Sequence, residues 1–254
     1  MTTSRKPRIL LVNDDGLNGP GLRPFIEALS SLGEVTAVVP EHERSADSHA
    51  LTLRHPLRVR KFGERFYCVD GSPADCARLG LLHILKKRCD LVVSGVNDGY
   101  NLGSDVIYSG TVAGALEGAL LGLPALAVSR GRSRRHADFH PAARVGVRAA
   151  RAVLKRGLPR GVCLNVNVPA VPESRLRGLK PARLGVRRYS QRVYTRKDPS
   201  GRPYYWICGP YISSILAPGT DVAAVARGFC PVTPLQLDNS HAGMLAQLEG
   251  WDFR

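Results

Sequence analysis

Two adjacent carboxylates, Asp14 and Asp15, follow directly on a short apolar run near the start of the 254-residue chain. The run, residues 9–12, is bounded by turn-forming residues, which is typical of a buried parallel strand. Open α/β sheets bind ligands just beyond the carboxyl ends of their strands. Two acids at that place repel each other and repel phosphate unless a cation lies between them, so the pair indicates a metal site. The alternative is a turn that caps the following helix.

Three loops follow predicted strands and carry oxygen side chains. Asp14 and Asp15 follow the strand at 9–12, Ser45 follows a strand at 35–39, and Asn97 follows a strand at 90–94. In a doubly wound sheet these loops share one edge, so the four side chains can converge. Carboxylate, hydroxyl and amide oxygens are hard ligands that suit Mg²⁺, Mn²⁺ or Ca²⁺ better than zinc.

A second element follows Asn97 along the same loop. Ser109, Gly110 and Thr111 lead into a predicted helix at 111–121. Hydroxyls and free backbone N–H groups at a helix N-terminus can bind an anion, although they can equally serve only as a cap. The glycines at 16, 19 and 21 run G-x-x-G-x-G and differ from the dinucleotide fingerprint, so we expect no NAD site there.

Strands and helices alternate through the first two thirds of the chain. This pattern predicts an α/β fold with a Rossmann-like, doubly wound, mostly parallel sheet. Short additional strands are expected at 51–53, 57–62 and 65–69. The main strands are expected at 9–12, 35–39, 90–94, 125–129 and 162–168, with helices at 20–31, 72–87, 111–121 and 141–156.

The pattern changes after Pro169. Strands at 186–195 and 203–207, joined by a polar turn at 197–201, predict a projecting β-hairpin arm, and a helix at 220–227 and a strand at 229–235 follow. We predict one domain over 1–254, with a core of about 1–182 plus 218–235, an arm at about 183–210 and a C-terminal tail at 236–254. Arm and tail have little core of their own, so we expect a partner chain to order them.

Composition points to a cytoplasmic protein with no membrane partner. No stretch approaches the roughly 20 apolar residues of a membrane span, and the N-terminus has too short an apolar run for a signal peptide. Six scattered cysteines include no CxxC pair. We expect them to be small buried hydrophobes instead of zinc ligands or disulfides.

The net charge of +15 is carried by one half of the chain. Residues 1–128 hold 14 Lys/Arg and 14 Asp/Glu, whereas residues 129–254 hold 22 and 7, and 29 of all 36 basic residues are Arg. Arginine binds phosphate bidentately, which is compatible with an anionic partner. The simpler explanation for most of these residues is that they lie on solvent-exposed faces.

Several motifs together resemble one family. They are VNDDGLNGPG (12–21), ERSADSHALTLRHPLRV (43–59), VDGSPADCARLGL (69–81), DLVVSGVNDGYNLGSDVIYSGTVAGALEGALLGLPALAVS (90–129), LNVNVP (164–169) and PGTD…VTPL (218–235). Through these segments, which span most of its length, the chain is similar to the survival protein SurE family of metal-dependent 5′-nucleotidases.

The resemblance implies a phosphomonoesterase acting on nucleoside 5′-monophosphates, with 3′-monophosphates and short polyphosphate as further substrates. It also implies one divalent cation per subunit, Mg²⁺ or Mn²⁺, and a homodimer or homotetramer. Asp14 and Asp15 are the predicted catalytic residues. The predicted metal ligands are Asp14, Asp15, Ser45 and Asn97, and the predicted phosphate- or substrate-binding residues are Asn101, Ser109, Gly110 and Thr111.

Two segments depart from the family pattern. Family members commonly have His-Gly-Ala after the ligand Asn, where this chain has Asp98-Gly99-Tyr100. Asp98 adds a negative charge and Tyr100 adds bulk. The turn before Pro20 also lacks the usual His-Ala, while none of the four expected ligands is lost.

The hypothesis is metal-assisted hydrolysis in which Asp14 or Asp15 orients or deprotonates a water. An aspartyl-phosphate route ranks lower because the acids are committed to the metal. A basic nucleic-acid-binding protein without phosphatase activity is the alternative, supported by Tyr and Trp residues among arginines at 189–206. A subunit-contacting arm explains those aromatic residues better, so nucleic acid is the less favoured partner. A metal-dependent sugar transferase is a third alternative. It requires two acids separated by one residue, whereas the two acids here are adjacent.

Overall fold

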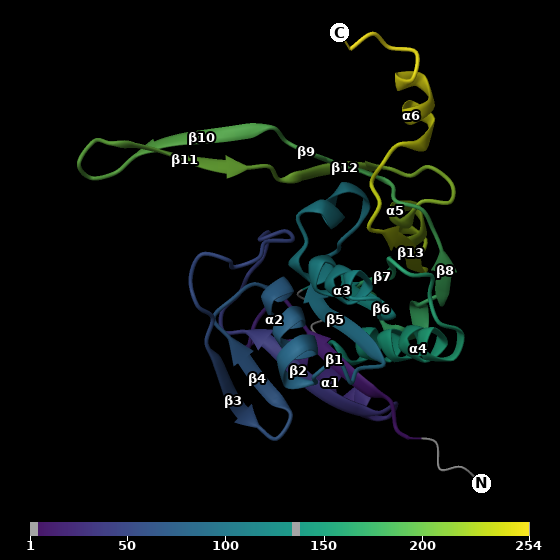
Figure 1. Cartoon of the computed structure of the whole chain (residues 1–254). Coiled ribbons are helices and arrows are strands. Elements are labelled where there is room, and N and C mark those ends of the chain that lie inside the picture. Colours follow the sequence, from purple (N-terminus) through teal and green to yellow (C-terminus); the bar gives the residue numbers. More distant parts are fainter. Residues whose placement is uncertain (1–4, 134–137, 254) are drawn as a thin grey trace.

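The computed structural model describes residues 5–133 and 138–253. Within them, nine strands form one sheet in the order β3-β4-β2-β1-β5-β6-β7-β13-β8 (Figure 1). The central strands from β4 to β7 are parallel, whereas β3 and β13 are antiparallel to their neighbours β4 and β7. The predicted mostly parallel, doubly wound sheet is therefore confirmed. The strands are β1 (Arg8–Val12), β2 (Glu34–Pro40), β3 (Val59–Gly63), β4 (Phe66–Val69), β5 (Leu91–Asp98), β6 (Ala125–Arg130), β7 (Val162–Val168), β8 (Leu179–Pro181) and β13 (Cys230–Gln236).

Helices cover both faces of the sheet. Along β1, Ile9 and Leu11 pack in the cluster on the α1 and α4 side, and Leu10 and Val12 pack in the cluster on the α2 and α3 side. Strand β1 is therefore apolar on both faces, as expected for the centre of a parallel sheet. The helices are α1 (Leu22–Ser30), α2 (Pro73–Leu79), α3 (Gly110–Leu120), α4 (His140–Arg156), α5 (Asp221–Ala226) and α6 (Ala242–Leu248), with shorter turns η1 (Gly80–Ile84), η2 (Gly103–Ile107) and η3 (Glu173–Arg175).

Two predicted boundaries and one predicted strand were wrong. Strand β5 does not end at Ser94, because Asn97 and Asp98 still pair with Ser129 and Arg130 of β6. The helix predicted over 72–87 ends as α-helix at Leu79 and continues as the π-helical η1. Residues 51–53 form no strand, since the backbone N–H of Thr52 donates to the Asp75 carboxylate instead of to a neighbouring strand.

The predicted arm is present as a long antiparallel ribbon that projects from the sheet (Figure 1). Its first strand breaks into β9 (Val186–Tyr189) and β10 (Arg192–Lys197), and its return consists of β11 (Pro203–Cys208) and β12 (Tyr211–Ile215). Strand pairing in the ribbon thus continues past residue 210, where the arm was expected to end. The division of the chain into core, arm and tail stays a prediction.

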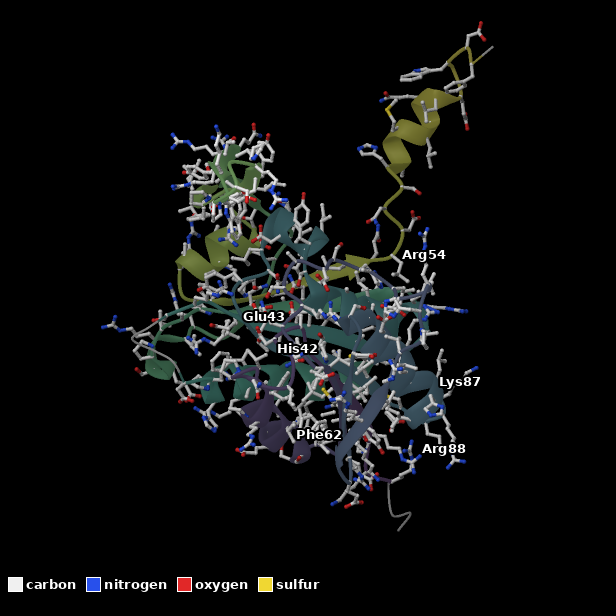
Figure 2. The ribbon with its side chains drawn as sticks, turned by 90° about the vertical axis from the view of Figure 1, so that its left-hand side faces the viewer. His42, Glu43, Arg54, Phe62, Lys87 and Arg88 are labelled. Atoms are coloured by element: carbon white, nitrogen blue, oxygen red, sulfur yellow. The ribbon has the colours of Figure 1, made fainter. Side chains whose placement is uncertain are left out.

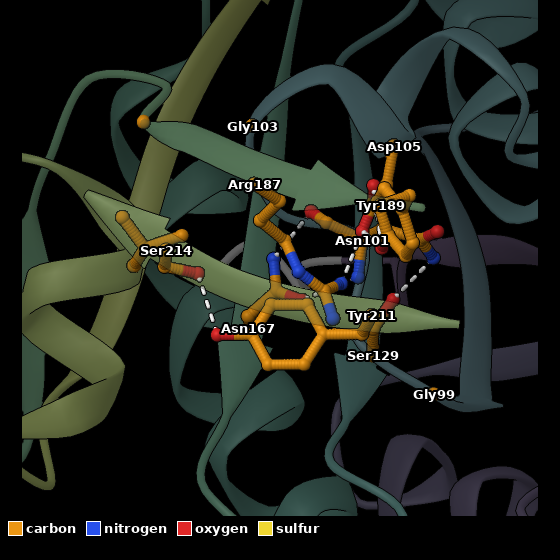
Figure 3. Close-up of polar contacts among 12 residues, drawn as sticks. Gly99, Asn101, Gly103, Asp105, Ser129, Asn167, Arg187, Tyr189, Tyr211 and Ser214 are labelled. Carbon is orange, nitrogen blue, oxygen red and sulfur yellow. Dashed lines mark hydrogen bonds and ion pairs between the residues drawn. The ribbon is translucent and has the colours of Figure 1, made fainter. Parts of the chain in front are cut away.

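The base of the ribbon is fixed to η2. Arg187 of β9 forms an ion pair with Asp105, and the Tyr189 hydroxyl donates to the same carboxylate (Figure 3). The Arg187 guanidinium also lies 5.3 Å and 4.8 Å from the ring centroids of Tyr189 and Tyr211. The charged side chain of Arg187, which lies near both rings, therefore connects the arm to the loop between β5 and α3.

Five cysteines are free and buried, which confirms for these five the prediction that they are small buried hydrophobes. The side chain of Cys208 lies outside the described part. These five are Cys68, Cys76, Cys89, Cys163 and Cys230. No helix in the described residues has the length and apolar character needed to cross a bilayer. The prediction that the N-terminus is no signal peptide concerned residues 1–8. Of these, residues 1–4 lie outside the described residues.

Candidate active site

The acid pair lies at the carboxyl edge of the sheet, where β1 ends. The backbone N–H of Arg44, in the loop after β2, donates to the backbone carbonyl of Asp14 at 2.8 Å. At the end of β5, the backbone N–H of Asp98 donates to the Asp15 carboxylate at 3.2 Å. The three segments that carry the predicted ligands therefore meet around Asp14 and Asp15.

Asp14 is held against the start of α3. Its side chain is 4% exposed, and the Thr111 hydroxyl donates a short hydrogen bond to its carboxylate. Burial raises the pKa of Asp14 above its ordinary value, although hydrogen bonds from Thr111 act in the opposite direction. The negative carboxylate lies at the positive end of the helix dipole, which is the favourable arrangement.

A glycine permits this close approach of helix and strand. A Cβ atom at Gly110 would lie 3.0 Å from the Asp14 Cβ and 2.9 Å from the Pro73 side chain. Ser109 caps α3 by accepting a hydrogen bond from the Val112 N–H at 3.1 Å. The N–H groups of Gly110 and Thr111 belong to the first turn, where a helix supplies no intrahelical acceptor.

Asp15 is only partly buried and has different surroundings. Burial, together with the neighbouring charge of Asp14, raises the pKa of Asp15 to about 7. Asp98 and Glu43 add to this rise, while the N–H of Asp98 opposes it. The site therefore concentrates negative charge.

The other two predicted metal ligands lie on the flanking segments. The Ser45 hydroxyl donates to the Glu43 carboxylate at 2.7 Å. The amide nitrogen of Asn97 donates to the Gly99 carbonyl at 2.9 Å, which leaves the amide oxygen as its ligand atom. Neither side chain makes a hydrogen bond to the acid pair.

The loop that carries Ser45 is anchored to α3 and η2. The Ser48 hydroxyl donates to the Ile107 carbonyl at 2.6 Å, and the His49 Nε2 lies 2.7 Å from the buried Glu117 carboxylate. Arg78 of α2 contacts the other Glu117 oxygen at 3.1 Å. These contacts fix the loop beside the acid pair.

The residues present fit a hard divalent cation. Two carboxylates, a hydroxyl and an amide oxygen form the donor set, and positive charge beside Asp15 would favour the ionised form that burial and the Asp14 charge disfavour. In the described residues no cluster of three or more His, Cys, Asp or Glu side chains has the arrangement of a metal site. A donor set with only two carboxylates is not expected to form such a cluster.

Asn101 is placed differently from the other predicted substrate-binding residues. It is buried, and its amide nitrogen donates to the Ser129 hydroxyl at 2.8 Å (Figure 3). Its backbone N–H donates to Asn167, and its carbonyl accepts from the amides of Asn165 and Asn167. The network fixes the chain just after β5 and occupies the Asn101 amide nitrogen within the protein.

Tyr100, the bulky departure from the family pattern, also points into the protein. Its hydroxyl accepts a hydrogen bond from the Ala170 N–H at 3.3 Å, and burial raises its pKa. A Cβ atom at Gly131 would lie 2.4 Å from the Tyr100 ring, so the ring packs directly on that glycine. The Tyr100 side chain is therefore accommodated within the protein, against the loop between β6 and α4 and the segment after β7.

A cavity of about 390 Å³ opens beside Asp15. Figure 2 shows His42 and Glu43 together on this face of the molecule. Three residues that line this cavity, His42, Glu43 and Arg132, were not predicted from the sequence. Glu43 could have been noticed, because it lies two positions before Ser45. Arg132 has no local sequence pattern that indicates its position. The cavity is lined by Asp15, Asn18, Gly19, Pro20, Glu41, His42, Glu43, Asp98 and Arg132.

Arg132 balances part of the negative charge in this cavity. Its Nε donates to the Asp98 carbonyl at 2.7 Å and lies 3.9 Å from the Asp98 carboxylate. The negative charge that Asp98 adds is therefore accompanied by a guanidinium from the loop after β6. An arginine in this position suits contact with a phosphate-bearing ligand.

Known proteins share both the sequence and the fold. A sequence model described as "Survival protein SurE" matches residues 9–191. A protein named "5'-nucleotidase SurE" from Geobacter metallireducens is 46% identical over 97% of this chain and 98% of its own length. "5'-nucleotidase SurE 1" from Thermus thermophilus is 50% identical, with 96% and 97% covered.

A solved structure agrees with these matches. The crystal structure of the SurE protein from Aquifex aeolicus superimposes with a TM-score of 0.86, at 43% identity, covering 96% of this chain and 98% of that chain. Sequence and structure together confirm the resemblance drawn from the motifs. The chain belongs to the survival protein SurE family.

Proposed function

We propose that this protein is a metal-dependent 5′-nucleotidase that hydrolyses nucleoside 5′-monophosphates to nucleoside and inorganic phosphate. The names of relatives at 46% and 50% identity over nearly the whole chain support the nucleotidase activity. The observation that carries the metal dependence is the Asp14–Asp15 pair, with the pKa of Asp15 raised to about 7 beside a buried second carboxylate.

Asp14, Asp15, Ser45 and Asn97 would hold one divalent cation, Mg²⁺ or Mn²⁺. When bound, the cation supplies Lewis acidity at the phosphoryl oxygen and lowers the pKa of a water. The contact between Asp14 and Thr111 supports this assignment, because it fixes one carboxylate while Asp15 stays accessible from the cavity.

The start of α3 would bind the phosphate oxygens. Ser109 sets the first turn, and the N–H groups of Gly110 and Thr111 would donate to the oxygens at the positive end of the helix. The Thr111 hydroxyl is occupied by Asp14, so its side chain positions the acid and its backbone contacts the substrate. Asn101 would act through the loop that it fixes.

Asp15 is the better placed of the two acids to handle the proton of the attacking water. Asp14 is almost fully buried and engaged by Thr111, whereas Asp15 lines the cavity. The aspartyl-phosphate route remains lower in rank because both acids belong to the proposed ligand set. Arg132 would contact a second phosphate, which supports activity on short polyphosphate, and 3′-monophosphates complete the proposed substrate range.

The test is phosphate release from a panel of 5′- and 3′-nucleotides and short polyphosphate, with Mg²⁺, Mn²⁺ or EDTA. We expect release from 5′-monophosphates that EDTA abolishes. Asp14→Asn and Asp15→Asn should each lower kcat at least a hundredfold, because each removes a charged ligand. Glu64→Gln removes one exposed carboxylate and is the matched control.

Retained activity in both aspartate variants would overturn the assignment of the site. Tight, salt-sensitive binding of oligonucleotides without any phosphate release would favour the nucleic-acid-binding alternative. That alternative rests on the aromatic and arginine-rich part of the sequence. One of its arginines, Arg187, forms an ion pair with Asp105 of the same chain.

A further inference from the structure

Asp221 is a fully buried carboxylate that has no part in the proposed chemistry. It lies in the segment PGTD, at the start of the family-like sequence at 218–235, and it is the first residue of α5. Its exposed fraction is 0%. A carboxylate in the first turn of a helix ordinarily stabilises that helix through the helix dipole. One hydrogen bond of Asp221 serves this purpose, the one from the Val222 N–H at 2.8 Å.

The other hydrogen bonds of Asp221 join two distant segments. Its Oδ2 accepts from the Gly103 N–H at 2.8 Å, and its Oδ1 accepts from the Gly185 N–H at 2.7 Å. These glycines are 118 and 36 residues away along the chain. Gly103 is the first residue of η2, and Gly185 directly precedes β9 at the base of the arm. The carboxylate therefore holds together α5, the arm base and the loop before α3.

Two glycines make this meeting of three segments possible. Gly103 has a left-handed φ of 55°, and a Cβ atom on it would lie 2.5 Å from the Gly185 carbonyl oxygen. A Cβ atom on Gly185 would lie 2.4 Å from the Val222 side chain and 2.9 Å from the Asp221 Oδ1. Figure 3 shows Gly103 beside the strand that carries Arg187. Segments packed this closely cannot shift independently of one another.

Little slack separates Gly103 from the start of α3. The turn η2 extends from Gly103 to Ile107, and the Tyr108 N–H closes its end by donating to the Asp105 carbonyl at 3.0 Å. The next residue, Ser109, is the cap of α3. A displacement of Gly103 is therefore passed on to the first turn of α3.

We propose that Asp221 is a positioning residue for substrate binding, which fixes η2 so that the first turn of α3 meets the phosphate group of the substrate. This inference rests on the proposed phosphate site at the start of α3. Donors that are fixed in place before binding need no further ordering when the substrate arrives. The four proposed metal ligands lie outside η2 and α3, so Asp221 should affect the binding of substrate more than that of the cation.

The test is Asp221→Asn, which keeps the size of the side chain and replaces one acceptor oxygen by an amide group that only donates. We expect faster hydrogen exchange at the amides of residues 109–113, measured by mass spectrometry, because the start of α3 is no longer fixed. KM for AMP with Mg²⁺ should rise roughly tenfold, since a small misplacement of binding groups has a large effect. The dissociation constant of Mn²⁺, measured by calorimetry without substrate, should stay unchanged.

Asp90→Asn is the matched control. The Asp90 carboxylate also accepts a backbone N–H from a distant segment, that of Arg8 at 2.7 Å. It precedes β5, however, and so lies at the edge of the sheet opposite to the acid pair. Asp90→Asn should leave both the exchange of residues 109–113 and KM unchanged. An equal change in the two variants would overturn the proposal, as would unchanged exchange in Asp221→Asn.

A carboxylate that serves only folding predicts a different result. Loss of folded protein would lower kcat in proportion to the folded fraction and leave KM as it is, and this result would also overturn the proposal. If Asp221→Asn does not fold, Gly185→Ala takes the same test, because it keeps the carboxylate and crowds its Oδ1.

The role of Asp221 and the nucleotidase activity can fail separately. No phosphate release from AMP by the unchanged protein would overturn the nucleotidase, while the exchange measurement would still decide whether Asp221 fixes the start of α3. Normal release together with an unchanged KM in Asp221→Asn would overturn only the role of Asp221.

Discussion

Asp14 and Asp15 are neighbours in sequence, but they have separate roles because their surroundings differ. Asp14 is buried and receives the Thr111 hydroxyl, which makes it part of the connection between β1 and α3. Among the described residues, Asp15 receives only the N–H of Asp98, and it faces a cavity with Glu43. A substitution at Asp14 therefore affects the fold and the site, whereas one at Asp15 affects mainly the site.

The raised pKa of Asp15 predicts how stability depends on pH when no divalent cation is present. A carboxyl group whose pKa rises from 3.8 to about 7 on folding binds more protons in the folded than in the unfolded state. Stability should therefore fall as pH rises from about 4 to 7, by at most about 4 kcal/mol for a shift of this size. Denaturant unfolding in EDTA at pH 5 and pH 8 measures this fall.

Asp15→Asn should remove most of that pH dependence, and Mg²⁺ or Mn²⁺ should restore stability at pH 8 in the unchanged protein. Glu64→Gln should leave the dependence as it is, because Glu64 is exposed. A protein that becomes more stable between pH 5 and pH 8 in EDTA would contradict the prediction.

Helix α3 is the element whose N-terminal end, the proposed phosphate-binding site, contacts the acid pair through Thr111. Its small residues let it lie close against β1 and β5. A Cβ atom at Gly114 would lie 2.7 Å from Val12 and 2.9 Å from the Ser94 hydroxyl, both in the sheet. Since Gly110 makes a similar approach to Asp14, the spacing of these glycines sets the distance between the helix and the site.

Gly114→Ala should therefore lower both stability and activity. Crowding in a packed core costs about 1–3 kcal/mol, and the gain of up to about 1 kcal/mol in helix propensity offsets only part of it. We expect a net loss of about 1–2 kcal/mol in denaturant unfolding and a fall in kcat as the helix start moves from Asp14. Gly243→Ala in exposed α6, where the nearest contact is an ordinary 3.4 Å, should be neutral or slightly stabilising.

The same elements show what the sequence could and could not predict. Apolar runs and helix spacing were enough to place β1, β2 and α3, and hence to bring Asp14, Ser45 and Thr111 to one edge. The end of β5 was misjudged because Asn97 and Asp98 pair with β6 through contacts that no local pattern reveals. A cavity lined by Arg8, Thr36 and Arg88 was not predicted for the same reason, because these residues meet only in the folded chain.

At the scale of the whole molecule, two parts have no core of their own. On one face of the ribbon, Val193 and Ile207 lie directly opposite each other, and Ile207 is 91% exposed. Helix α6 has no buried residue, and Trp251 and Phe253 beyond it are exposed. Such apolar surface supports the homodimer or homotetramer that the family resemblance implies, which stays a prediction.

Light scattering at micromolar concentration should give the mass of a dimer or tetramer. Val193→Lys/Ile207→Lys should shift the mass to a smaller species without loss of secondary structure, because it places two charges on the exposed apolar face. Leu53→Lys, at a side chain that is 84% exposed outside the arm, should leave the mass unchanged. A concentration-independent monomer of the unchanged protein would refute the proposed assembly.

The acid pair follows β1, and β1 pairs with β5 through contacts such as Ile9 with Leu91, about eighty residues later. Thr111, which shelters Asp14, comes later still. At about 5–20 residues per second, synthesis of the chain from Asp15 to Thr111 takes about 5–20 seconds. During that interval Asp14 lacks the residue that shelters it. The acid pair is therefore synthesised well before the site around it is complete.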